Sequence, residues 1–120
     1  MTLDAGSFGG KRVLVTGGAG AIGSRLSKTL ADMGALVTVI DDLSASQRWT
    51  VPDHPNVSFI LGSVLDEQAL RQAFASRPQF VYHLAALFAN QNSVEHPETD
   101  LMVNGMGTLR VLEYSHLSGV

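Results

Sequence analysis

The segment VTGGAGAIG, residues 15–23, places three glycines at a spacing of three residues: Gly17, Gly20 and Gly23. The run RVLVT just before it is apolar and β-branched, which is typical of a buried strand. The stretch 21–33 just after it has the apolar period of a helix. Where a strand leads into a helix, one glycine permits a tight turn, another lets the backbone approach a ligand, and a third lets the helix pack on the strand. The alternative is a turn that is merely tight.

The rest of the chain alternates in the same way. Further strands are predicted over 35–40, 57–61 and 80–85. Further helices are predicted over 66–75 and 97–117, whereas 41–56 has no clear period and is expected to be mostly loop. Apolar strands separated by helices indicate a parallel sheet covered on both faces. The expected fold is α/β, a Rossmann-type doubly wound parallel sheet whose first four strands have the order 3-2-1-4, with flanking helices.

Side chains at the helix ends support these boundaries. The first helix has an apolar stripe that is expected to face inward, made of Ile22, Leu26, Leu30 and Met33. Gly34 is a suitable residue to end it. Asp66 can cap the second helix, and Pro97 suits the first turn of the last one.

Length and charge exclude several classes of protein. A chain of 120 residues holds one domain at most, predicted here as 11–120 behind a flexible leader at 1–10. A net charge of −3 without a block of lysine and arginine argues against a nucleic-acid partner, and no apolar run is long enough to span a membrane. Cysteine is absent and the four histidines lack metal-ligand spacing, so no metal site is expected. His83 is interpreted as a hydrogen-bonded histidine within a strand.

Two features indicate a dinucleotide ligand. The first helix would present the amides of Ala21 and Ile22 at its positive end, where a pyrophosphate can bind. Asp41 follows the second predicted strand, about twenty residues beyond the glycine loop. A carboxylate there accepts hydrogen bonds from ribose hydroxyls and repels a 2′-phosphate, which favours NAD over NADP. A solvated turn aspartate is the alternative for Asp41.

Four motifs in order carry a resemblance to a known family. They are VTGGAGAIG, DDLS at 41–44, HLAA at 83–86 and VNGMGTLRVLE at 103–113. The chain resembles the N-terminal part of the extended short-chain dehydrogenase/reductases, in the NAD-dependent sugar-nucleotide epimerase/dehydratase group. UDP-glucose 4-epimerases are the nearest type, with UDP-glucuronate 4-epimerases or decarboxylases beside them. The resemblance implies that 11–120 is an incomplete NAD-binding Rossmann domain.

The resemblance also implies a set of NAD-binding positions. The glycine loop would bind the pyrophosphate, DDLS the adenine ribose, and HLAA would pass under the cofactor. The residues expected to line the cofactor site are Gly17, Gly20, Ala21, Ile22, Gly23, Asp41, Asp42, Leu43, Ser44, Ser63, Val64, Leu84, Ala85, Ala86 and Asn104. One position departs from the family pattern, because Ser63 follows Gly62 where an aspartate often holds the adenine amine. A serine hydroxyl can hydrogen-bond but supplies no charge.

The residues of the family's chemistry are not found in this chain. The family transfers a hydride at the sugar C4 with the help of a Tyr-x-x-x-Lys pair, but Tyr82 and Tyr114 are followed four residues later by Ala86 and Ser118. We therefore expect this chain to hold no catalytic residue and to be inactive alone, as the N-terminal segment of a cytoplasmic, homodimeric enzyme that acts on a nucleotide-diphosphate sugar. A 4-epimerase is the first expectation. A dehydratase or decarboxylase of the family, or a non-catalytic NAD sensor or scaffold, remains the alternative.

Overall fold

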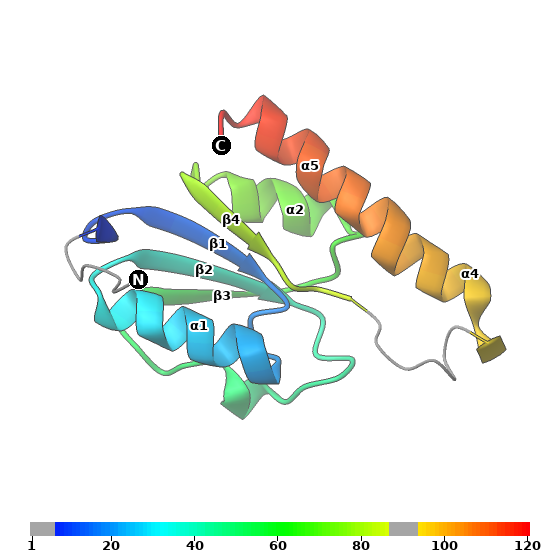
Figure 1. The fold of residues 1–120 in the computed structure, drawn as a ribbon, viewed down its shortest axis with the longest axis horizontal. Coiled ribbons are helices and arrows are strands. Elements are labelled where there is room, and N and C mark those ends of the chain that lie inside the picture. Colours follow the sequence, from blue (N-terminus) through cyan, green and yellow to red (C-terminus); the bar gives the residue numbers. More distant parts are fainter. Residues whose placement is uncertain (1–6, 87–93) are drawn as a thin grey trace.

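Four parallel strands form a single sheet in the computed structural model, which describes residues 7–86 and 94–120 (Figure 1). The strands are β1 (Arg12–Thr16), β2 (Leu36–Asp41), β3 (Val57–Leu61) and β4 (Phe80–His83). Their order is β3-β2-β1-β4, which confirms the predicted topology. Thr16 pairs with Ile40 on one side and His83 on the other, so the carboxyl ends of three strands meet at one edge.

Helices α1 (Ala21–Asp32) and α2 (Glu67–Phe74) lie on opposite faces of this sheet (Figure 1). The predicted last helix is one long rod, but its middle is not α-helical. It consists of α4 (Pro97–Asp100), a π-helical segment Leu101–Met106 and α5 (Gly107–Leu117). A short 3-10 turn, η2 (Arg48–Thr50), interrupts the predicted loop after β2. Within the described parts of the chain, no helix has the length and apolar character needed to cross a membrane.

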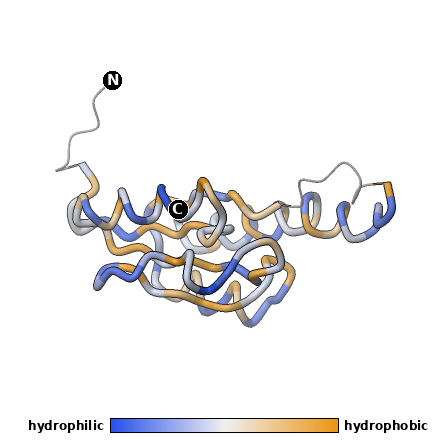
Figure 2. The backbone as a smooth tube through the Cα atoms, turned by 90° about the horizontal axis from the view of Figure 1, so that it is seen from below, coloured by the Kyte–Doolittle hydropathy of each residue, from blue (hydrophilic) through white to orange (hydrophobic). Residues whose placement is uncertain are grey.

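The core has two layers, one on each face of the sheet. Val13 and Val15 of β1 pack with α1, whereas Leu14 between them packs with α2 and α5. This alternation follows from the two-residue period of a strand. Figure 2 shows the strands as hydrophobic runs inside the fold. Both faces are therefore covered, as the continuous apolar strands predict.

The predicted inward stripe of α1 is wrong at its start. Ile22 is 74% exposed, and the buried residues of the helix are Gly23, Ser27, Leu30 and Ala31. The reason is the contact of Gly23 with the preceding loop, where a Cβ would lie 2.2 Å from the Gly17 carbonyl oxygen. Because Gly23 faces the loop, the neighbouring Ile22 points away from the sheet.

The predicted leader divides into two parts. Residues 1–6 lie outside the described residues. Phe8 packs against the α1 layer with its ring centroid 5.5 Å from that of Phe80, and the Gly10 amide donates to the Gly34 carbonyl at 2.9 Å. The packed part of the chain thus begins before residue 11.

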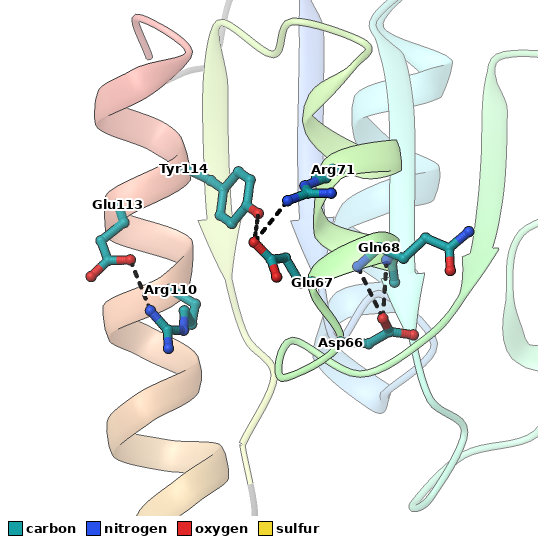
Figure 3. Close-up of polar contacts among 8 residues, drawn as sticks. Asp66, Glu67, Gln68, Arg71, Arg110, Glu113 and Tyr114 are labelled. Atoms are coloured by element: carbon teal, nitrogen blue, oxygen red, sulfur yellow. Dashed lines mark hydrogen bonds and ion pairs between the residues drawn. The ribbon is translucent and has the colours of Figure 1, made fainter.

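Polar contacts fix α2 against its neighbours (Figure 3). Asp66 caps the helix by accepting hydrogen bonds from the amides of Gln68 and Ala69, as predicted. Glu67 accepts from Arg71 at 3.0 Å and from the Tyr114 hydroxyl at 3.3 Å, so α5 is joined to the first turn of α2.

Candidate functional site

The glycine loop is shaped by two contacts that no side chain would permit. Gly17 has φ +70°, and a Cβ there would lie 2.7 Å from the Ala85 amide nitrogen. Gly23 is in contact with the Gly17 carbonyl, as described above. A Cβ at Gly20 would meet only the Gly17 oxygen, at 3.3 Å. Gly17 and Gly23 are thus explained by the turn and by helix packing, whereas Gly20 leaves the loop open toward a ligand.

A cavity of about 670 Å³ lies at the carboxyl ends of the strands, within the usual range of ~300–1,000 Å³ for ligand pockets. Its lining includes every predicted site residue except Leu43: Gly17, Gly20, Ala21, Ile22, Gly23, Asp41, Asp42, Ser44, Ser63, Val64, Leu84, Ala85, Ala86 and Asn104. The structure adds lining residues that were not predicted: Ile40, Ala45, Ser46, Gly62, His83, Val103 and Thr108. Most of these are neighbours in sequence of predicted positions. Thr108 is different, because its place at the cavity depends on a contact with His83, 25 residues away.

The N-terminal end of α1 faces this cavity with backbone N–H groups that have no capping partner and carry partial positive charge. Its N-cap is Gly20, which has no side chain to cap the helix, and its first turn holds no acidic residue. The first amides of a helix lack partners within the helix and carry about half a positive charge. Ala21, Ile22 and Gly23 thus offer backbone N–H groups suited to a phosphate.

Asp41 ends β2 and its carboxylate is held by two backbone amides. Oδ2 accepts from Ala19 at 3.0 Å, and Oδ1 accepts from Leu43 at 2.8 Å. Leu43 contributes through its backbone, with φ +62°, rather than by lining the cavity. The next carboxylate, Asp42, accepts from the Ser44 amide at 2.9 Å. Asp41 is therefore held in one orientation toward the cavity, with lone pairs left over for donors from a ligand.

The opposite wall is built from the loop after β3 and from the long helical rod. The Ser63 hydroxyl accepts from the Leu65 amide at 3.1 Å. Val64 is buried, and a Cβ at Gly107 would lie 2.6 Å from its Cγ2, so this glycine allows α5 to approach. Asn104 lies in the π-helical segment, and its amide nitrogen donates to the Asp100 carboxylate.

His83 is hydrogen-bonded through both ring nitrogens, as its interpretation predicts. Nδ1 lies 2.6 Å from the Thr16 hydroxyl, and Nε2 lies 3.1 Å from the Thr108 hydroxyl. Half-burial of the ring lowers the pKa of His83, because desolvation disfavours the charged form. Among the described residues, no cluster of three or more histidine or carboxylate side chains could hold a metal ion.

Comparisons with known proteins agree with this geometry. The family model described as "NAD dependent epimerase/dehydratase family" matches residues 13–120. A UDP-glucose 4-epimerase of Mycolicibacterium smegmatis is 35% identical over 112 residues, which is 91% of this chain and 36% of the relative. One of Streptomyces lividans is 37% identical over 111 residues, again 91% of this chain and 33% of the relative. The chain thus spans about a third of the length of the curated relatives it matches.

Solved structures give the same result. An epimerase of Methanothermobacter thermautotrophicus superposes with a TM-score of 0.94 at 52% identity, covering 97% of this chain and 34% of that one. UDP-glucose 4-epimerase of Thermus thermophilus in complex with NAD superposes with a TM-score of 0.84 at 41% identity, covering 91% and 35%. The family match extends over nearly the whole chain. The chain therefore belongs to the NAD-dependent epimerase/dehydratase family.

Proposed function

We propose that this chain forms the NAD-binding part of a sugar-nucleotide 4-epimerase, which inverts C4 of a nucleotide-diphosphate sugar by transient hydride transfer. The observation that carries the proposal is one cavity that brings together the uncapped start of α1, the Asp41 carboxylate and the backbone of Leu84 to Ala86. Its relatives include several UDP-glucose 4-epimerases. NAD, when bound, supplies a hydride acceptor that can also return the hydride.

The chain's residues would hold the two halves of the dinucleotide. The amides of Ala21 and Ile22 would bind the pyrophosphate at the start of α1, since Gly20 lets it come close. Ser63 and Val64 would lie beside the adenine. Asn104, in the π-helical segment that lines the same cavity, would lie near the reacting end of the cofactor. These assignments follow the family motifs and the shared cavity.

The choice of cofactor would be made by Asp41. Two backbone amides already orient its carboxylate oxygens. The Asp41 side chain therefore loses little conformational entropy when it accepts a hydrogen bond from a ribose hydroxyl. A 2′-phosphate at the same place would meet a carboxylate, and the described residues that line the cavity include no lysine or arginine to compensate its charge. NAD is therefore the proposed cofactor.

The proton transfer would not be done by the tyrosines of this chain. Tyr114 donates to Glu67 of α2, and neither Tyr82 nor Tyr114 has a lysine four residues later. We propose that the chain alone is inactive and that it acts within a longer, cytoplasmic protein. A homodimer is supported by the exposed leucines along the helical rod, which are Leu101, Leu109 and Leu112.

A dehydratase or a decarboxylase is the second candidate. Its support is a decarboxylase of Bacillus cytotoxicus at 31% identity and a probable dTDP-glucose 4,6-dehydratase of Sinorhizobium fredii at 34% identity. A non-catalytic NAD sensor or scaffold is the third candidate, since the cavity could bind NAD in either kind of protein.

Two measurements test the proposal. Calorimetric titration of NAD and NADP into the purified protein should show tighter binding of NAD. Incubation of the full-length protein with NAD and UDP-glucose should yield the sugar inverted at C4, seen by NMR. A product that has lost water or carbon dioxide would favour the second candidate, and NAD binding without turnover of any nucleotide sugar would favour the sensor.

A further inference from the structure

A continuous hydrogen-bond chain crosses the cavity wall from β1 to the helical rod. Thr16 ends β1 and pairs in register with His83, which ends β4. The Thr16 hydroxyl lies 2.6 Å from His83 Nδ1, and His83 Nε2 lies 3.1 Å from the Thr108 hydroxyl. The Thr108 hydroxyl in turn donates to the Asn104 carbonyl at 2.6 Å. Segments that are 67 and 25 residues apart are joined through one imidazole.

The partners of each hydroxyl determine where the protons lie. The Thr16 hydroxyl oxygen accepts from the Ala85 amide at 3.1 Å and shares the Leu84 amide, also at 3.1 Å, with the Thr16 carbonyl oxygen at 3.0 Å. With its oxygen turned toward these two amides, the hydroxyl has its single hydrogen left for Nδ1 of His83, which then carries no proton. At the other end, the Thr108 hydrogen is used by the Asn104 carbonyl, so this oxygen accepts from Nε2–H. The network therefore fits one form of His83, neutral and protonated at Nε2.

We propose that His83 is a positioning residue of the cofactor cavity, which fixes the π-helical turn carrying Asn104 relative to the glycine loop. One side of the connection is rigid because Gly17 is in contact with the Ala85 amide that Thr16 also binds. The other side includes the carbonyl of Asn104 itself, within Leu101–Met106. A π-helical turn holds one residue more than an α-turn and is often found at functional sites.

If His83 only filled space, its ring nitrogens would not need hydrogen-bond partners. Packing alone requires a ring of this size but no particular proton position. Here, by contrast, both ring nitrogens have a hydroxyl partner, and the Thr108 hydroxyl has a further partner that uses its hydrogen. The half-buried ring is also kept neutral, because its pKa is lowered by desolvation. This proposal for His83 depends on the proposed NAD site only in the measurement of NAD affinity, and the NMR measurements do not depend on it.

The test uses the purified protein and three substitutions. Thr108→Val removes the acceptor of Nε2–H at nearly constant volume, whereas Thr108→Ser keeps the hydroxyl. Thr29→Val, on the exposed side of α1, is the matched control. ¹⁵N NMR of the imidazole at neutral pH reports which nitrogen of His83 carries the proton, and the Asn104 side-chain amide signal reports its position. Calorimetry gives NAD affinity.

We expect wild type to show a single Nε2–H tautomer. Thr108→Val should shift the Asn104 amide signal and weaken NAD binding about fivefold, the scale of one hydrogen bond, with recovery in Thr108→Ser. Thr29→Val should change neither. An Nδ1–H tautomer in wild type, or equal Asn104 signals in the valine and serine variants, would overturn the proposal. If wild type fails to bind NAD, the proposed function is lost, but the tautomer and the Asn104 signal still decide the role of His83.

Discussion

The Asp41 carboxylate and the Ala19 amide, 22 residues apart, are joined by a hydrogen bond of 3.0 Å. Thr50 makes a second connection to the same loop, because its hydroxyl lies 2.6 Å from the Ala19 carbonyl oxygen and shares its hydrogen between this oxygen and the Gln47 carbonyl oxygen at the same distance. The segment after β2 and the glycine loop after β1 are thus held together through both backbone groups of Ala19. Asp41 thus holds the glycine loop in place, in addition to its proposed role toward the cofactor.

Substitution of Asp41 should separate these two roles. Asp41→Asn keeps the shape but loses the charge, so NAD binding should weaken about tenfold, the scale of a hydrogen bond to a charged group. The preference for NAD over NADP should narrow at the same time. The single asparagine oxygen can accept from only one of the Ala19 and Leu43 amides, and Asp41→Ala accepts from neither, so the melting temperature should fall in Asp41→Asn and fall further in Asp41→Ala. Calorimetry and thermal unfolding measure the two effects. Unchanged NAD affinity in Asp41→Asn would show that Asp41 does not contact the cofactor.

Comparison of Gly17→Ala with Gly10→Ala measures how much the close approach of Gly17 to the Ala85 backbone contributes to the free energy of unfolding when a side chain is added. Both have positive φ, +70° and +72°, but a Cβ at Gly10 meets nothing within 4 Å. Gly10→Ala should therefore cost only the left-handed backbone strain, about 1–2 kcal/mol. Gly17→Ala adds the clash with the Ala85 backbone, and its free energy of unfolding should fall by about 2 kcal/mol more. Urea denaturation measures both. Equal losses in the two variants would mean that the loop moves aside without cost.

Ser27 offers a substitution that should stabilise the protein. It is fully buried in α1, and its hydroxyl has no hydrogen-bond partner among the residues that the structure describes. Burial of a hydroxyl without a partner is unfavourable, and alanine is the best helix former, so Ser27→Ala should raise the free energy of unfolding by about 1 kcal/mol. Ser24→Ala on the same helix is the control, since Ser24 is only half-buried. A urea midpoint that falls in Ser27→Ala would show that this hydroxyl has a partner.

The sequence predicts well those features that a short segment determines. Asp66 is next to the helix that it caps, and Gly17 is next to the strand that it follows, so both were identified from neighbours. Ile22 was misplaced because helical periodicity does not show that Gly23 must contact the loop. The hydrogen-bond partners of His83 could not be predicted, because Thr16 and Thr108 are 67 and 25 residues away in the sequence. The π-helical turn has no local signature here either, apart from Gly105 and Gly107 within a helix.

The lowered pKa of His83 predicts a stability that depends on pH in a defined direction. The folded protein keeps this ring neutral below the ordinary value of 6.5, whereas the unfolded chain is protonated there, so the unfolded state binds more protons. The contribution of His83 is fully present above that value and is lost as pH falls from it toward the lower folded pKa. Thermal unfolding at pH 7.5 and 5.5 should show a larger loss in wild type than in His83→Gln, which cannot titrate. His54→Gln, which alters a histidine paired with Asp32 outside the cavity, is the control for other histidines. Equal losses in wild type and His83→Gln would mean that protonation of His83 does not oppose folding.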